Sequence, residues 1–494
     1  MQRRLIGVLL FVFLAALSVS AHVGSPDVFF EGDAGPYHLF VTVIVPQVIP
    51  GIAQIQVRSS SSDVEKIEIV PMRLTGPGSN LPPAPDIAER SQQDPEFFTG
   101  SLWLMEFGAL KVRVTAEGSK GKGELAVPVP AFAQRSLPMQ KSLGGLLAFL
   151  MVFLAVGLVF IAGAAAREGN LAPGQAPSPS RKARARIVMV VTAVVVVVIL
   201  YLGNAWWGAE AKNYSRDINY FKPPIAETSL DNGSRLIIRA KGEDPEWSRR
   251  VKMEDVIPDH DHLMHLFLIG EPGLNRLWHL HPERAAGGAF ADDLPSMPAG
   301  RYKVFADIVD KNGFPWTLVG QMDLPQTSGK PLSGDDSTWS GAALSQQSSA
   351  TTIAPLPDGG QLVWEKPSRP IASNAALDLK FKIENKDGSP AKDVEPYMGM
   401  AGHTEIVSSD FSVFAHIHPA GSVSMAALEL ANAPIPSAAK DLFGGQMAMP
   451  MSSAPLAPEV SFPYGFPKAG LYRMFVQIKR AGQIETGVFD VRVQ

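Results

Sequence analysis

Short runs in which apolar and polar residues alternate are the commonest pattern in the chain, and they predict β-strands. Such runs recur through residues 22–135 with Pro, Gly and Ser between them, which favours a small β-sandwich. A polar, proline-rich stretch at 80–95 is expected to be a loop within it. The strands predicted here are 37–45, 53–58, 66–74, 101–106 and 109–116.

Two longer runs are apolar throughout. Residues 143–166 are long enough to cross a bilayer as a helix, and the slightly shorter run 187–204 precedes Trp206 and Trp207, which suit a membrane interface. The stretch 167–186 between them has five basic residues against one acid, so the positive-inside rule places it in the cytoplasm. The flanking portions are therefore expected outside the cytoplasm.

The first residues have the pattern of a secretory signal. Two arginines precede an apolar run at 5–17, and small residues end at Ala21. Residues 1–21 are thus predicted to be removed, which leaves His22 at the amino terminus. An uncleaved anchor is the alternative. Together with the two spans, this predicts a two-pass protein of a bacterial inner membrane with its soluble domains in the periplasm.

Alternating runs resume after the second span and predict two further β domains, at 205–325 and 353–494. A Ser-, Gly- and Thr-rich stretch at 326–352 has the composition of a linker. The third domain carries an insertion at about 431–458. The predicted fold class is therefore mainly β, with three β-sandwich domains, two transmembrane helices and a signal peptide.

The third domain is predicted to be a diverged copy of the second. HLFLIGEPGLNRLWHLHP at 265–282 matches HTEIVSSDFSVFAHIHP at 403–419, and AGRYKVF at 299–305 matches AGLYRMF at 469–475. If each copy is a β-hairpin, the two histidines of His-x-His share a face and the single histidine lies across the ladder. The copies differ by one residue in spacing, so one of them needs a different turn or a bulge.

Composition narrows the chemistry. The chain has no Cys, which excludes disulfides and thiolate sites, and its net charge of -4 offers no basic surface, so nucleic acid is not an expected partner. No nucleophile elbow or phosphate-binding loop is present, and Asp292-Asp293 and Asp335-Asp336 are interpreted as solvated surface. We therefore expect no enzyme.

Histidine and methionine are the remaining candidate metal ligands. Neutral imidazole binds copper, zinc and nickel, and thioether beside imidazole favours copper, with zinc as the alternative. Surface histidines on edge hairpins and a flexible methionine loop are the other interpretations. The candidate ligands are His260, His262, His265, His279 and His281 in the second domain, and His403, His416, His418, Met398, Met400, Met447, Met449 and Met451 in the third.

The predicted amino terminus offers a separate candidate site. A free α-amine and the imidazole of His22 form a bidentate chelate, and His38 can complete a two-histidine brace, assisted by Asp27 and Asp33. A disordered terminal histidine is the alternative interpretation.

Two segments carry family resemblances. HVGSPDVFFEGDAGPYHLFVTVIVPQVIPG, starting at His22, is similar to periplasmic YtkA-like and CopC-like copper-binding β-sandwich domains, which implies His22 as a copper ligand, with His38 beside it. EPYMGMAGHTEIVSSDFSVFAHIHP and its upstream copy resemble a poorly characterised bacterial extracytoplasmic domain of Ig-like or cupredoxin-like shape, which implies handling of copper or other heavy metals. The second domain lacks the Tyr-Met-Gly-Met lead-in of the third.

The predicted function is a membrane-anchored periplasmic metal-binding protein that serves copper resistance, storage or delivery. Its expected partners are the inner membrane and a periplasmic metal donor or acceptor protein. A non-metal scaffold or adhesion module, and a copper oxidoreductase that uses a His22 brace, are the alternatives.

Overall fold

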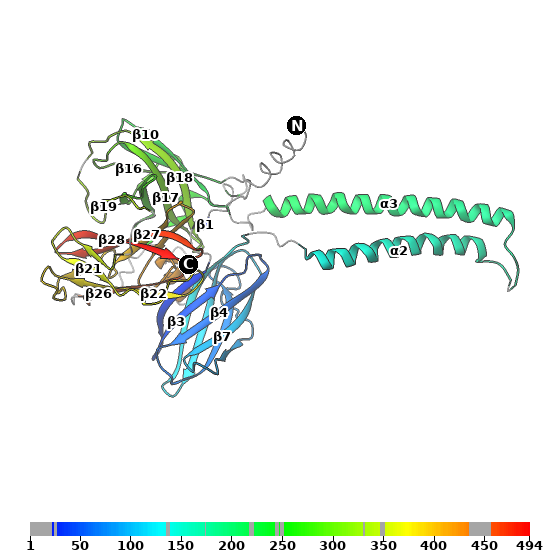
Figure 1. Cartoon of the computed structure of the whole chain (residues 1–494), viewed down its shortest axis with the longest axis horizontal. Helices are drawn as coiled ribbons and strands as arrows, with labels where there is room; N and C mark the ends of the chain where they lie inside the picture. The colour runs from blue at the N-terminus through cyan, green and yellow to red at the C-terminus, as the bar shows by residue number, and fades with distance from the viewer. Residues whose placement is uncertain are drawn as a thin grey trace, which may run out of the picture. The chain divides into compact units, whose positions relative to one another are not determined.

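The structure is a computed structural model that confirms a mainly β fold with two long apolar helices (Figure 1). Two compact units comprise residues 1–132 with 222–494, and residues 133–221, so all three predicted β domains belong to one unit. The predicted signal peptide, residues 1–21, lies outside the described residues, as does most of the predicted insertion. The structure describes residues 22–23, 27–134, 139–172, 174–216, 222–242, 247, 251–329, 331–345, 351–433 and 456–494.

The helical unit consists of α2 (Lys141–Glu168) and α3 (Pro179–Arg216), and both helices are long and apolar enough to cross a membrane. The helices extend beyond the apolar runs. Only residues 169–178 of the predicted loop connect them, because α3 already includes the basic residues at 181–186. Arg, Lys and Ala are good helix formers, so helical structure continues where hydrophobicity ends.

The first β domain is a sandwich around one apolar core. Strand β6 lies in the stretch predicted to be a loop, and it pairs with both β5 and β7. Sequence patterning also missed β2 and β9; the latter contains Pro128 and Pro130, which a strand at the end of the sheet tolerates. The strands are β2 (Val28–Ala34), β3 (Tyr37–Ile44), β4 (Gly51–Ser59), β5 (Val64–Arg73), β6 (Asp86–Arg90), β7 (Phe97–Leu104), β8 (Gly108–Gly118) and β9 (Gly121–Ala131).

The second domain forms one sheet in the order β15-β16-β11-β10-β18-β17-β13-β14-β19, with β12 on β17. The predicted linker at 326–352 is corrected here, because β19 within it pairs with β14 and completes the sheet. The elements are β10 (Ile225–Asp231), β11 (Arg235–Lys241), η1 (Met253–Asp255), β12 (Val256–Ile257), β13 (His265–Gly270), β14 (Arg276–Leu280), β15 (Glu283–Ala285), η2 (Ala286–Gly288), β16 (Ala289–Asp293), β17 (Gly300–Asp310), β18 (Pro315–Leu324) and β19 (Ser337–Ser340).

The third domain has two sheets. One has the order β20-β21-β22-β26, and the other has the order β1-β25-β24-β27-β23 with β28 on β27. The short strand β1, at the predicted mature amino terminus, pairs with β25 in parallel. The elements are β1 (His22–Val23), β20 (Ile353–Pro355), β21 (Gln361–Trp364), β22 (Leu377–Glu384), β23 (Val394–Glu395), β24 (His403–Ser408), β25 (Val413–Ile417), α5 (Met425–Asn432), β26 (Glu459–Tyr464), β27 (Gly470–Arg480) and β28 (Gln483–Val493).

The two repeated segments are hairpins with the same strand order. Strands β13, β14, β17 and β18 correspond to β24, β25, β27 and β28. The one-residue difference in spacing falls entirely in the loops, since 271–275 joins the first hairpin and 409–412 joins the second. A different turn, and not a bulge, therefore keeps the histidines of both copies on one face.

The two hairpins pack against each other through an apolar core. The rings of Phe305 and Phe414 stack with centroids 4.2 Å apart, and Phe267 lies 5.1 Å from Phe414. Val407 and Phe475 belong to the same buried cluster. This core holds the second and third domains together directly beside the histidines.

Candidate metal centre

Eight of the ten histidines form one continuous cluster between the second and third domains. Their rings are linked by centroid distances that run from 3.8 Å, for His262 and His281, to 6.0 Å, for His260 and His265. The hairpin register places His279 opposite Phe267 and His416 opposite Glu405. The cluster contains His260, His262, His265, His279, His281, His403, His416 and His418.

The first trio consists of His265, His279 and His281, one ring nitrogen of each lying within 4.8 Å of the others. Each ring donates its proton outward. His265 Nε2 donates to the carbonyl oxygen of Asp259 at 3.1 Å, His279 Nδ1 to Gln477 Oε1 at 2.9 Å, and His281 Nδ1 to Asp336 Oδ1 at 2.9 Å. In the neutral rings the remaining nitrogens therefore carry lone pairs.

These lone pairs face one another. His265 Nδ1 and His279 Nε2 are 3.2 Å apart with no proton between them. His281 Nε2 is buried and has no hydrogen-bond partner within the described part of the chain. Nitrogens bound tetrahedrally to one ion at about 2.0–2.1 Å lie about 3.3 Å apart, so a cation between the rings would satisfy the arrangement.

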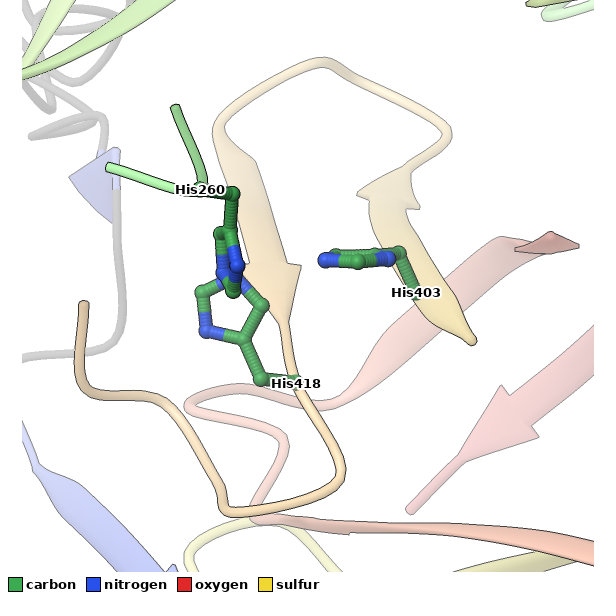
Figure 2. A group of neighbouring side chains, drawn as sticks. All are labelled: His260, His403 and His418. Carbon is green, nitrogen blue, oxygen red and sulfur yellow. The ribbon is translucent and has the colours of Figure 1, made fainter. Parts of the chain in front are cut away.

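The second trio consists of His260, His403 and His418, again with one nitrogen of each within 4.8 Å of the others. Figure 2 shows the rings directed toward one another, with His403 and His418 on the neighbouring segments of the third domain and His260 from the second. His260 Nε2 and His418 Nε2 are 3.2 Å apart. The ring nitrogens of this second trio therefore come from both domains.

His416 lies between the two trios. Its ring centroid is 5.2 Å from that of His265 and 5.4 Å from that of His403. Its Nδ1 is 3.6 Å from Asp307 Oδ2, while its Nε2 has no partner among the described residues. The carboxylate oxygens of Glu405, fully buried beside it, have no hydrogen-bond partner within the same ranges, although Oε1 lies 3.8 Å from His279 Nδ1. The cluster thus contains further atoms that have no hydrogen-bond partner among the described residues and are of the kind that binds metals.

Burial keeps these imidazoles in the metal-binding form. It lowers the pKa of His265, His279, His403 and His416 well below the usual value, and neighbouring imidazoles add to the effect. A neutral ring offers a lone pair, whereas a protonated ring offers none. Burial also raises the pKa of Asp307 to about 7.

The interpretation of Asp335 and Asp336 as solvated surface is corrected, because both contact histidines of the cluster. Asp336 Oδ1 accepts hydrogen bonds from both the backbone nitrogen and Nδ1 of His281. Asp335 Oδ2 lies 3.3 Å from His262 Nε2. Burial, with the charge of Asp292, raises the pKa of Asp336 to about 7. Strand β19 brings this pair to the cluster.

A tight turn of the same kind precedes each hairpin, although the residues in the two turns differ. Asp259 and His262 exchange two backbone hydrogen bonds, and so do Tyr397 and Met400. The central residues have positive φ in both turns, 52° at His260 and 48° at Met398. His260 therefore occupies the position of Met398, and His262 that of Met400, at identical distances along the chain from the first hairpin histidine.

The predicted methionine ligands stay predictions. Met398 is buried and accepts a hydrogen bond from His260 through its backbone, and Met400 is partly buried on the same turn. Met447, Met449 and Met451 lie outside the described residues.

The predicted amino-terminal site involves residues elsewhere in the fold. His22 pairs with Val413 through its backbone. The exposed ring of His38 binds Glu31 at 2.8 Å and Asp33 at 2.7 Å, and Asp27 accepts a hydrogen bond from the backbone of Val45. Both ring nitrogens of His38 are thus occupied by carboxylates, and the brace remains untested.

Three contributors to the cluster were missed. Gln477 and Tyr397 both contact His279 Nδ1, the latter at 3.3 Å, and Asp259 accepts from His265 while its carboxylate accepts from the backbone of Ala426. The sequence contains a signal that marks Gln477 as part of the repeat. This residue lies two positions after AGLYRMF, as Asp307 lies two positions after AGRYKVF. Each lies opposite the first hairpin histidine.

Comparison with known proteins adds a family match for one part of the chain. The profile of a family described as "Domain of unknown function (DUF8832)" matches residues 358–494. No curated protein matches the chain.

Likenesses to solved structures are faint. Dimeric latent PorU from Porphyromonas gingivalis is 8% identical with a TM-score of 0.14, over 95% of this chain and 34% of PorU, so the chain spans about a third of that protein. A putative membrane anchored protein from Corynebacterium diphtheriae is 8% identical with a TM-score of 0.15, over 94% of each chain. The alpha-2-macroglobulin of E. coli is 12% identical with a TM-score of 0.17, over 93% of this chain and 26% of its own. At such scores these likenesses carry no argument about function.

Proposed function

We propose that this protein binds copper, with zinc as the alternative ion, in the histidine cluster between its second and third domains. The observation that carries the proposal is the first trio, His265, His279 and His281. Each ring proton there is donated outward and the free nitrogens converge. Outward hydrogen bonds of this kind fix the tautomer and orientation of metal-binding histidines.

The chemistry of the donors favours a borderline or soft transition metal. A set of imidazoles suits copper and zinc, whereas calcium and magnesium require oxygen ligands. The methionines that the sequence places near the third-domain histidines, and the resemblance to copper-binding periplasmic domains, give copper precedence.

Enclosure of the trio supports a binding role. His279 is fully buried and His265 is 2% exposed, while catalytic metal sites keep an open position for substrate. Storage, resistance or delivery to a partner protein therefore fits better than catalysis.

Anchoring and location are part of the same proposal. The two apolar helices supply membrane spans, and the basic residues at 167 and 181–186 at their connected ends favour a cytoplasmic loop. That orientation puts the histidine cluster on the periplasmic side of a bacterial inner membrane.

Metal titration of the full chain in detergent tests the proposal. The metal-free protein is titrated with Cu⁺ and Zn²⁺, and retained metal per chain is measured by mass spectrometry after dialysis. We expect tight retention of at least one ion, and a loss of about tenfold or more in affinity for His281→Ala, since one ligand is removed. Asp86→Ala, at an exposed residue of the first domain, is the control. Retention of neither ion, or an equal loss in the control, contradicts the proposal.

A further inference from the structure

The second trio differs from the first in being shared between domains. His260 lies on the turn before the first hairpin, whereas His403 begins β24 and His418 follows β25 (Figure 2). Neither domain alone supplies more than two of its donors. A metal ion at this position requires the second and third domains to be docked.

One ring of the second trio is held by an outward hydrogen bond that leaves its lone pair facing inward. His418 Nδ1 donates to the carbonyl oxygen of Val423 at 2.9 Å, so the Nε2 of the neutral His418 ring carries a lone pair. His260 Nε2 faces this lone pair at 3.2 Å. His403 is fully buried with neither ring nitrogen paired within the described ranges.

The two trios are not equally supported. All three rings of the first are held by outward hydrogen bonds, which they donate to Asp259, Gln477 and Asp336. In the second, His403 has no such bond among the described residues, so only packing orients its ring. Removing such a bond from a metal-binding histidine typically costs about 10–100-fold in affinity.

We propose that His260, His403 and His418 form a second metal site, which loads after the first and releases its ion more readily. The inference rests on the proposed metal-binding function. The ion at this site connects the second domain to the third, and His416, whose Nε2 is unpaired between the trios, offers a further nitrogen to it. The chain then holds one retained ion and one exchangeable ion.

The test counts ions in the full chain. Metal-free protein in detergent is titrated with Zn²⁺ and, separately, with Cu⁺ under competition from a chromophoric chelator. We expect two ions per chain, the second bound about tenfold or more weakly. His260→Asn should lower the count to one and leave the affinity of the first ion unchanged. Asn tolerates the left-handed backbone at this position, so the turn is preserved.

Further measurements keep the outcome decisive. Saturation with the second ion should raise the melting temperature of the native chain and not that of His260→Asn, with Asp86→Asn, an exposed change in the first domain, behaving as native. A single ion per chain that is insensitive to His260→Asn overturns the second site while the proposed function stands. A single ion lost equally from His260→Asn and His281→Ala overturns the separation into two sites. Binding of no ion overturns both proposals.

Discussion

The two hairpins share one ladder and differ in what each position contributes. Glu405 and His416 occupy the places of Phe267 and His279, and Gln477 occupies the place of Asp307. The histidines are kept in both copies, while the carboxyl group beside them lies at Asp307 in the first copy and at Glu405 in the second. The two hairpins therefore form one asymmetric cluster and not two equivalent sites.

Each trio depends on residues from both the second and the third domain. The histidines of the first trio all belong to the second domain, but Gln477 and Tyr397 of the third domain accept the proton of His279 Nδ1. The second trio takes its third donor, His260, from the opposite domain. Each half completes the other, and the apolar core beside them holds the pair in register.

The largest effect is expected from the core between the hairpins. Phe414, whose counterpart in the first hairpin is Leu277, stacks on Phe305 and is 1% exposed. Phe414→Ala should lower the free energy of unfolding by about 3–5 kcal/mol, because a buried aromatic ring is lost and a cavity remains. Denaturant unfolding of the metal-free chain measures this. A loss below that of Leu277→Ala would show that the domains are held together elsewhere.

A smaller effect of opposite sign is expected at Glu405. Burial raises the pKa of this carboxyl well above its usual value, and neither oxygen has a hydrogen-bond partner within the described residues, with His279 Nδ1 3.8 Å from Oε1. Glu405→Leu, which makes the third domain resemble the second at Phe267, should stabilise the metal-free chain by about 1–3 kcal/mol. Unfolding in urea tests this against the exposed change Glu459→Leu. A destabilised Glu405→Leu chain would contradict the expectation and reveal a partner for the carboxyl.

The smallest effect concerns the loop that distinguishes the hairpins. Burial raises the pKa of Asp410, but Lys468, Ser408 and Ser412 outweigh it, so the net pKa is lowered. A carboxyl with a lowered folded pKa stabilises above its unfolded value of about 3.9, and the contribution fades as pH falls below it. Asp410→Asn should therefore cost about 1 kcal/mol or less at pH 7, and progressively less in acid. Melting temperatures across pH, with Asp86→Asn as control, check the trend; a pH-independent cost would refute it.

Local patterning was enough for the features that depend on neighbouring residues. Hydropathy located both apolar helices, and the spacing of His-x-His placed two rings of each hairpin on one face. Helix ends were missed because helix propensity persists beyond the apolar run. Strand β19 was missed because its four residues, Ser337–Ser340, lie in a Ser- and Gly-rich stretch and form a strand only against β14.

The composition of each trio could not be predicted because it depends on tertiary packing. Nothing near His260 in the sequence indicates His403 or His418 as its neighbours, and Asp336 reaches His281 only because β19 returns to the edge of the sheet. Alignment of the repeats would have gone further. That alignment places His260 at the position of Met398, and so identifies the two turns as equivalent.

The division of the second trio between His260 and the pair His403 and His418 also bears on how the protein is made. As the chain emerges during synthesis, His260 appears long before the last two ligands, so the trio does not exist until the third domain has been completed and has docked. Under the proposal, capture of the exchangeable ion is then the last step of maturation. Its presence distinguishes finished molecules from partly assembled ones.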